Sequence, residues 1–270
     1  MSNDIWKHAR GARATAPAET PAPAKPKELR LHGLNAVLAL FARTPQRLRK
    51  VYLTEARVSG VKDLLKWCAQ NRVGYRVVEE GDLAKLAQTS HHEGIVADVL
   101  PAPEKNLGTW LREMTAADTR VCALWLDGVG NPHNLGAILR NAAHFGATAV
   151  LIESTAPSPV SGASARVAEG GAEQVTVVRL PADAKQALRQ LREAGFVLAA
   201  TLVHEGDNLF TTDLPGKLVY VMGAEQQGMH KGLAEACDMK VWIPGTGGVE
   251  SLNVASATAV FLAEWARRNA

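Results

Sequence analysis

Residues 126–147, LDGVGNPHNLGAILRNAAHFGA, carry a strand end, a turn and an amphipathic helix in direct succession. Apolar positions after the turn recur at helical spacing and predict a buried stripe, formed by Leu135, Ile138, Leu139, Ala142 and Ala143. Asn134 can cap the N-terminus of this helix, and Pro132 stiffens the approach to it. The segment therefore predicts a helix that begins at a polar turn and packs one face on a core.

Arg140 lies off the predicted stripe, on the helix face that it shares with Gly136 and His144. Gly136 has no side chain, so we expect open space on this face one turn before the arginine. The residues alone allow two interpretations. Arg140 is either a solvent-facing residue of a capped surface helix or a phosphate-binding residue on a surface that glycine keeps clear.

Apolar runs flank this helix and predict a strand, helix, strand unit. The predicted strands of the C-terminal part are residues 121–129, 149–154, 175–180, 196–203, 218–223 and 241–245, and its other helices are residues 183–194 and 251–268. Several of these apolar runs are continuous instead of alternating, as in a parallel sheet covered on both faces. The predicted fold class is therefore α/β with a parallel sheet.

The first part of the chain reads as a tail, a small domain and a linker. Residues 1–29 are rich in Ala and Pro and predict a disordered basic tail, with a transit peptide as the less favoured alternative. Residues 30–100 predict a small α/β domain with helices at 31–42, 61–72 and 82–89 and strands at 50–54, 74–79 and 94–100. Residues 101–118 are the predicted linker to a second domain at 119–270.

The basic charge is concentrated in the first hundred residues. Residues 1–100 carry a net charge of +6, whereas residues 101–270 carry −3. Four basic residues lie close together between the first predicted helix and strand of the small domain: Arg43, Arg47, Arg49 and Lys50. This asymmetry indicates a polyanionic partner such as nucleic acid, although a solubility role or a solvated rim explains it equally well.

Composition restricts the compartment and the chemistry. No stretch approaches the roughly 20 apolar residues of a membrane span, and the N-terminus lacks a secretory pattern, so we expect a cytoplasmic protein without a membrane partner. The cysteines, which are Cys68, Cys122 and Cys237, are widely separated and are expected to be free thiols. His91, His92 and Glu93 are adjacent but lack the spacing of metal ligands, so no metal is expected.

Glycine-rich or polar stretches follow three of the predicted strands, at residues 127–134, 221–229 and 244–250. Ligands of open α/β sheets bind at such strand ends. Ser251 is a natural N-cap for the last helix, and Asn253 lies in its first turn. The sequence contains no GxGxxG fingerprint, P-loop or GxSxG elbow, which argues against a nicotinamide enzyme, an ATPase and a hydrolase.

Three ordered motifs resemble those of the SpoU (TrmH) family of RNA ribose 2′-O-methyltransferases, which belongs to the SPOUT class. These motifs are residues 126–147, VMGAEQQGM at 221–229 and IPGTGGVESLNVASA at 243–257. The stretch SARVAEGGAEQVTVV, residues 164–178, resembles the connecting segment of the family. Residues 31–100 resemble the RNA-binding domain of ribosomal-protein type that many members carry, with LHGLNAV at its start and HHEGIVADV near its end.

This resemblance implies a C-terminal parallel-sheet domain with a trefoil knot, a homodimer, and S-adenosylmethionine as the cofactor bound in the knot. The positions that match the family's cofactor site are Gly223, Ile243 and Leu252. The positions that match its catalytic set are Asn134, Arg140, Glu225, Ser251 and Asn253. Two departures lie beside the expected ligand loop: Gly245 stands where methionine is common, and NVASA replaces the more usual NVSVA.

The implied reaction is methyl transfer from S-adenosylmethionine to a ribose 2′-hydroxyl of structured RNA, with 23S ribosomal RNA as the expected substrate. Three alternatives are a tRNA 2′-O-methyltransferase, a base methyltransferase of the wider knotted class, and an RNA-binding protein that has lost turnover. A guanidinium stays protonated, so we expect Arg140 to clamp a phosphate and not to act as the base. We expect Asn134 and Ser251 to orient Arg140 and the ribose, and Glu225 to accept a hydrogen bond from Asn253 or from the backbone.

Overall fold

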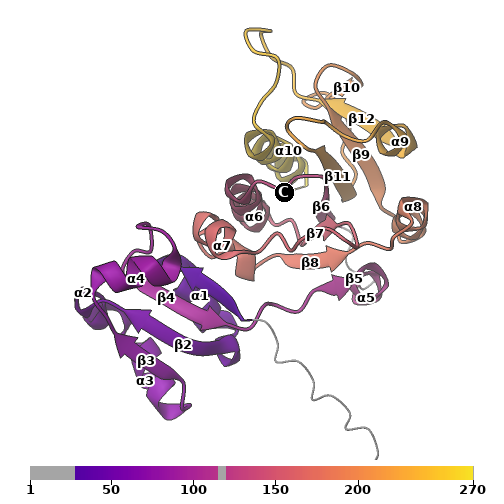
Figure 1. The fold of residues 1–270 in the computed structure, drawn as a ribbon. Helices are drawn as coiled ribbons and strands as arrows, with labels where there is room; N and C mark the ends of the chain where they lie inside the picture. Colours follow the sequence, from indigo (N-terminus) through magenta and orange to yellow (C-terminus); the bar gives the residue numbers. More distant parts are fainter. Residues whose placement is uncertain (1–27, 115–119, 270) are drawn as a thin grey trace, which may run out of the picture.

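The computed structural model describes residues 28–114 and 120–269, and the predicted tail lies outside this range except for its last two residues. The described chain contains one four-stranded and one eight-stranded sheet. Figure 1 shows the smaller sheet with its helices at the lower left and the larger sheet at the upper right. The predicted fold class, α/β with a parallel sheet after a smaller α/β unit, is confirmed.

The small unit is built on a mixed sheet in the order β1 (Leu29–His32), β4 (Ile95–Val99), β2 (Leu48–Leu53) and β3 (Gly74–Val77). β4 is antiparallel to β1 and β2, and β2 is parallel to β3. The helices of this unit are α1 (Leu34–Arg43), α2 (Glu55–Val58), α3 (Lys62–Gln70) and α4 (Glu80–Ala87). The helix predicted at 31–42 starts three residues later, because residues 29–32 form β1 and Gly33 turns the chain with a φ of 95°.

The large sheet has the order β10 (Asp207–Asn208), β12 (Met239–Trp242), β9 (Val197–Leu202), β11 (Lys217–Gly223), β6 (Val121–Asp127), β7 (Ala149–Ile152), β8 (Thr176–Arg179) and β5 (Lys105–Asn106). The strand pairs of this sheet are parallel. The continuous apolar runs of the sequence correspond to its central strands, which are buried along their length.

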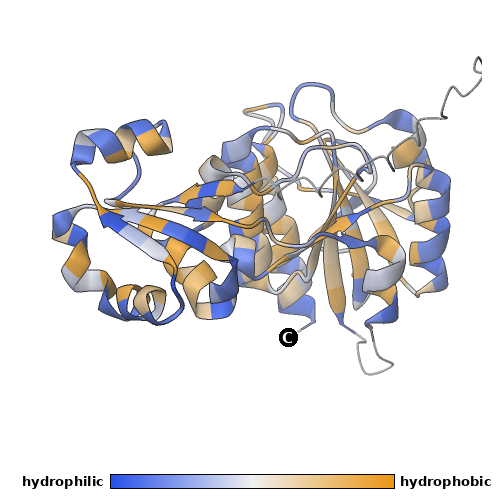
Figure 2. Ribbon diagram, turned by 60° about the horizontal axis from the view of Figure 1, so that its bottom comes forward, coloured by the Kyte–Doolittle hydropathy of each residue, from blue (hydrophilic) through white to orange (hydrophobic). Residues whose placement is uncertain are grey.

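Helices cover both faces of the large sheet. One core cluster lies under α6 (Pro132–Phe145) and α10 (Val254–Arg268), and α7 (Gly162–Ala168) packs beside α6. The opposite cluster lies under α5 (Leu107–Arg112), α8 (Ala184–Glu193) and α9 (Lys231–Ala236). Alternate residues of β6 enter the two clusters, with Leu124 on one side and Trp125 on the other. Figure 2 shows the resulting hydrophobic strands between helices whose outer faces are hydrophilic.

The predicted linker, residues 101–118, contains part of the large sheet. Lys105 and Asn106 form β5, which pairs with β8 at the sheet edge. The Asn106 side chain accepts a hydrogen bond from the backbone N–H of Thr109 at 2.8 Å and so caps α5, which buries Leu107 and Trp110. The large sheet therefore begins at Lys105, before the predicted start of the second domain.

Two further expectations can be compared with the described residues. Cys68 and Cys122 are buried, Cys237 is half-buried, and all are free thiols as predicted. None of the helices within the described ranges is both long and apolar enough to cross a membrane.

The two units are joined by α7 and the short helix η3 (Gly171–Glu173), which contact β1 and α1 of the small unit. Arg47 and Glu173 form an ion pair across this junction at 2.6 Å, and the side chains of both are more than nine-tenths buried. Arg43 donates to Gln174, and Asn35 donates to Glu169. The basic cluster, for which a solvated rim and a nucleic-acid contact were both open interpretations, therefore contributes Arg47 and Arg43 to the junction.

Gly136 lies where α6 closely approaches α7. A Cβ at this position would lie 2.5 Å from the Ser164 carbonyl oxygen and 2.6 Å from Val167 Cβ. The expectation of open space beside Gly136 is therefore wrong, because α7 fills that space. Because Gly136 has no side chain, α6 and α7 can pack closely there, and the sequence alone does not reveal that α7 is the neighbour.

Gly136→Ala should lower the free energy of unfolding by about 1–3 kcal/mol, because overpacking outweighs the better helix propensity of alanine. Gly232 in α9 is the matched control, since no atom lies within 4 Å of a Cβ built there. Gly232→Ala should be neutral or slightly stabilising. The two variants are compared by urea unfolding followed by circular dichroism, and equal midpoints would contradict the close contact of α6 with α7.

Candidate active site

Loops that follow neighbouring parallel strands meet at one edge of the large sheet. β6 ends at Asp127 and β11 ends at Gly223, and these two residues lie opposite each other in the strand register. From β6 the chain passes to β7 on one side, whereas β9 and β12 lie on the other side of β11. Open α/β sheets bind ligands at such a reversal of strand order. The edge beyond Asp127 and Gly223 is therefore the candidate site.

The first loop ends in a capped helix. The Asn131 side-chain oxygen accepts hydrogen bonds from the backbone N–H groups of His133 at 2.9 Å and Asn134 at 3.4 Å. Pro132 occupies the first helical position, where no N–H is needed. The prediction that Asn134 caps the helix is wrong, since Asn131 does. Asn134 lies in the first turn, which leaves its side chain available for other contacts.

The second loop folds back as a tight hairpin that presents Glu225. Ala224 and Gly228 exchange both of their backbone hydrogen bonds, at 3.1 and 2.8 Å. A Cβ at Gly223 would lie 2.5 Å from the backbone nitrogen of Met229. Glycine is therefore required at this position by the close approach of the loop's own backbone. Glu225 lies within the hairpin and is exposed.

Asp127 anchors the far end of this hairpin, a contact that the sequence analysis missed. Its buried carboxylate accepts hydrogen bonds at 2.8 Å from the backbone N–H of His230 and from His230 Nδ1. The hydrogen bond and the negative charge of Asp127 raise the pKa of His230. A carboxylate at the end of a continuous apolar strand was the available signal, because a buried charge needs a partner.

Asn253 joins the three loops through one side chain. Its oxygen accepts hydrogen bonds from the backbone N–H groups of Ala255 at 3.0 Å and Ser256 at 3.3 Å, which makes it the N-cap of α10. Its Nδ2 donates to Asn134 Oδ1 at 3.0 Å and to Glu225 Oε1 at 2.6 Å. The expected hydrogen bond between Asn253 and Glu225 is confirmed.

Ser251 does not cap the last helix, which is a correction of the prediction. It lies exposed in the loop after β12, two residues before the cap that Asn253 provides. The side-chain oxygen of Asn253 satisfies two free N–H groups of the first turn, which is the task expected of Ser251. Ser251 is thereby left at the surface of the loop, next to the candidate site.

Arg140 lies on a different face of α6 from the Asn134 side chain. Asn141 shares the face of Asn134, seven residues earlier, and donates to the Ala255 carbonyl oxygen at 2.9 Å. Arg140 instead borders η3, where a Cβ at Gly171 would lie 2.9 Å from Arg140 Cα. Its side chain is exposed, and no hydrogen bond joins it to the described side chains of Asn134, Glu225 or Asn253. One chain therefore brings together three of the five predicted catalytic residues.

The loop after β12 offers apolar and backbone groups beside this cluster. Ile243 packs partly against the core, and Leu252 remains 49 % exposed, which is high for a large apolar side chain. A Cβ at Gly245 would have no neighbour within 4 Å. Exposed backbone next to an uncovered leucine fits a ligand that has an apolar part and is held largely by main-chain groups.

The second of the adjacent histidines of the small unit, His92, has a structural explanation. His92 is buried, its Nδ1 accepts a hydrogen bond from the Gly94 N–H at 3.2 Å, and its Nε2 lies 3.5 Å from a Glu80 carboxylate oxygen. Within residues 28–114 and 120–269, no three His, Cys, Asp or Glu side chains gather as a metal site.

Two family models match the chain. The model of the SpoU rRNA Methylase family matches residues 121–263, and the model described as RNA 2′-O ribose methyltransferase substrate binding matches residues 30–105. The first of these matches contains the three loops and the Asn134, Glu225 and Asn253 cluster.

Similar proteins carry related descriptions. The chain is 37 % identical over 243 residues to "Uncharacterized tRNA/rRNA methyltransferase YfiF" of Escherichia coli O157:H7, covering 90 % of this chain and 69 % of that protein. It is 34 % identical over 242 residues to the 23S rRNA (guanosine-2′-O-)-methyltransferase RlmB of Pseudomonas putida, covering 88 % and 96 %. Among solved structures, the AdoMet-bound rRNA methyltransferase of Sinorhizobium meliloti superposes with a TM-score of 0.71 at 25 % identity, covering 90 % and 87 %.

The sequence motifs and the parallel sheet are consistent with the match to the methylase model, and the small unit corresponds to the match to the substrate-binding model. The chain belongs to the SpoU rRNA methylase family.

Proposed function

We propose that this protein transfers a methyl group from S-adenosylmethionine to a ribose 2′-hydroxyl of RNA, with 23S ribosomal RNA as the substrate. The observation that carries the proposal is the Asn253 side chain, which ties Asn134 and Glu225 together at the strand-order reversal of a SpoU-family sheet. The relatives described as 23S rRNA methyltransferases, with 34 % identity over nearly their whole length, support the choice of substrate. We place this activity in the cytoplasm.

The cofactor fits the loop after β12. Leu252 and Ile243 would supply apolar contact, and Gly223 and the exposed backbone around Gly245 would supply main-chain groups. When bound, S-adenosylmethionine supplies an electrophilic methyl group. The trefoil knot implied by the family resemblance, in which this loop would lie, stays a prediction.

The protein has to position the ribose and remove a proton. The 2′-oxygen forms a bond to the methyl carbon as the carbon–sulfur bond breaks, and the 2′-hydroxyl proton leaves at the same time. Arg140 cannot accept that proton, since a guanidinium stays protonated. We infer that Arg140 clamps the phosphate beside the target ribose and that this phosphate or a water takes the proton. Asn134, Ser251 and Asn253 orient the ribose, and Glu225 holds the hairpin through Asn253.

We propose that the site is completed in a homodimer, with Arg140 supplied by the partner subunit. Two observations support this arrangement: the Arg140 side chain is exposed, and it leaves α6 on a different face from Asn134. A two-fold dimer that pairs the α6 and α10 edges would bring each arginine to the other subunit's cluster. Each site would then contain residues of both chains.

Purified protein with S-adenosylmethionine labelled in the methyl group should transfer label to unmodified 23S ribosomal RNA. The labelled dinucleotide should resist alkaline hydrolysis, because a methylated 2′-oxygen cannot attack the adjacent phosphate. Heat-inactivated protein is the control. Label on tRNA and not on ribosomal RNA would identify tRNA as the substrate. Labelled nucleotides that remain sensitive to alkaline hydrolysis would indicate base methylation. Binding of S-adenosylmethionine without methyl transfer would contradict the enzymatic proposal.

Mixing two inactive variants tests the shared site. Arg140→Ala and Asn253→Ala homodimers should each be inactive, whereas subunits exchanged between them should regain about a quarter of the wild-type activity, because half of the dimers are mixed and each has one intact site. The measurement is labelled methyl transfer after co-refolding. No recovery, in a mixture shown by mass spectrometry to contain mixed dimers, would place Arg140 and Asn253 of one site in the same chain.

A further inference from the structure

Two adjoining cavities lead from the small unit towards the candidate active site. The first, of about 610 Å³, lies on the small sheet, and the second, of about 480 Å³, lies between the two units. Arg30 and Leu86 line both cavities, so the two lie next to each other. The site described above uses neither cavity, and their lining side chains have no assigned role.

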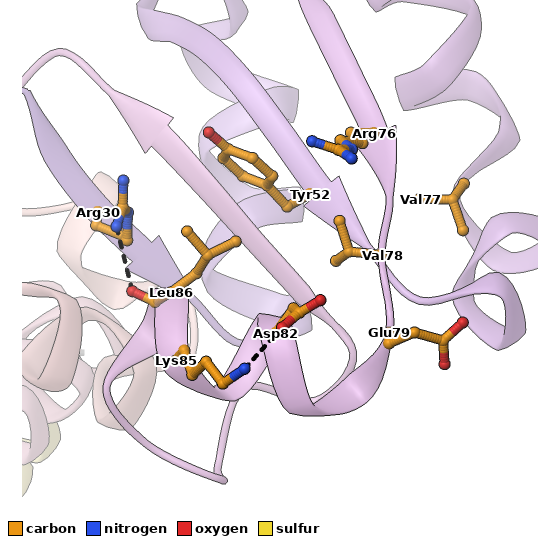
Figure 3. A pocket seen from close by; sticks show the side chains of 9 residues that line it. All are labelled: Arg30, Tyr52, Arg76, Val77, Val78, Glu79, Asp82, Lys85 and Leu86. Atoms are coloured by element: carbon orange, nitrogen blue, oxygen red, sulfur yellow. Dashed lines mark hydrogen bonds and ion pairs between the residues drawn. The ribbon is translucent and has the colours of Figure 1, made fainter.

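The first cavity is lined by a half-buried aromatic ring between basic side chains. Tyr52 on β2 and Arg76 on β3 are partners in the strand register and therefore lie on the same face of the sheet. Figure 3 shows the Tyr52 ring between the guanidinium groups of Arg30 and Arg76. Lys50 Nζ lies 4.8 Å from the centre of the same ring. A half-buried ring flanked by cations suits a stacked base and its phosphates.

The charges of this cavity are not all neutralised within the protein. Arg30 is paired with Asp98 at 2.7 Å, and Lys85 is paired with Asp82 at 2.9 Å. Arg76, in contrast, has no acidic partner within 4.0 Å among residues 28–114 and 120–269. Glu79 is the other acidic residue of the lining. Arg76 is therefore the side chain most available to a phosphate.

The lining of the second cavity contains no Asp or Glu residue, and burial lowers the pKa of its His32. Its ionisable residues are two arginines and three histidines: Arg30, Arg166, His32, His91 and His133. Arg166 Nε donates to the His91 carbonyl oxygen at 2.7 Å and lies 3.7 Å from a Glu93 carboxylate oxygen, so its charge is partly compensated within the protein. His133 lies seven residues before Arg140 in α6, so this cavity ends on the face of the helix that carries Arg140.

The width of the second cavity is set by the junction between the two units. The buried Arg47 to Glu173 ion pair and the hydrogen bonds of Asn35 and Arg43 hold the small unit against the segment that follows α7. Breaking one side of a buried pair leaves an uncompensated charge, which makes such a junction costly to open. The cavity thus has a defined shape in the isolated protein.

We propose that these two cavities form one track for single-stranded RNA, which runs from Tyr52 and Arg76 past Arg30 to Arg166 and His133. This inference rests on the proposed function and adds where the RNA next to the target ribose lies. A base stacks on Tyr52, and the phosphates that follow are held by Arg76 and by the basic residues between the units. The track delivers the strand to the face of α6 that carries Arg140.

The test measures binding of a short fluorescein-labelled single-stranded RNA to the full-length protein at several salt concentrations. Tyr52→Leu should weaken binding roughly ten-fold or more through lost stacking. Arg76→Ala should reduce the slope of log affinity against log salt concentration by about 0.7, the value for one lost contact to single-stranded phosphate. His133→Ala should weaken binding in the same sense.

Lys66→Ala is the matched control, because Lys66 is an exposed cation on α3, which packs on the opposite face of the same sheet. It should leave affinity and slope unchanged, and thermal unfolding should show that all variants are folded. Tyr52 and Arg76 variants that bind like Lys66→Ala would overturn the track, while intact wild-type methyl transfer would leave the proposed function standing. Binding that is weakened by the Tyr52 and Arg76 variants, in a wild type that transfers no methyl group, would support the track and contradict the proposed function. A wild-type protein that binds no RNA would contradict both the track and the proposed function.

Discussion

The side-chain amide of Asn253 is the interaction on which the candidate site depends. Its oxygen caps α10 and its nitrogen holds Asn134 and Glu225, so one residue connects the loops after β6, β11 and β12. An asparagine can do this because it has both an acceptor and two donor hydrogens on one planar group. The anchoring of the hairpin by Asp127 and His230 leaves Glu225 within reach of that amide.

Helix α6 connects the candidate site to the rest of the molecule. Its face with Asn134 and Asn141 meets the start of α10, and its face with Gly136 and Arg140 meets α7 and η3. The same α7 and η3 segment carries the buried ion pair of Glu173 with Arg47. The small unit and α6, which carries Asn134, are therefore both packed against one connecting segment, which gives an RNA held by the small unit a defined position relative to α6.

Periodicity predicted much of this fold, because the strands of a covered parallel sheet and a fourteen-residue helix leave long, regular apolar patterns. It missed several short elements that take their stability from tertiary contacts, which are β1, β5, β10, α2, α5, α7 and α9. The capping residues were misplaced because the sequence offers two polar candidates at each helix start, and only the loop conformation selects Asn131 over Asn134 and Asn253 over Ser251. The role of Gly136 and the bond from Asp127 to His230 depend on partners far along the chain, which no local pattern contains.

Asn253→Asp separates the two tasks of this side chain. Aspartate keeps the oxygen that caps α10 but has no N–H for Asn134 and Glu225, and it places a second carboxylate beside Glu225. The variant should unfold within a few degrees of the wild type, while its rate of labelled methyl transfer to ribosomal RNA should fall on the order of 100-fold, because the loops that position the ribose are no longer tied together. A folded Asn253→Asp protein that methylates RNA at the wild-type rate would contradict this account.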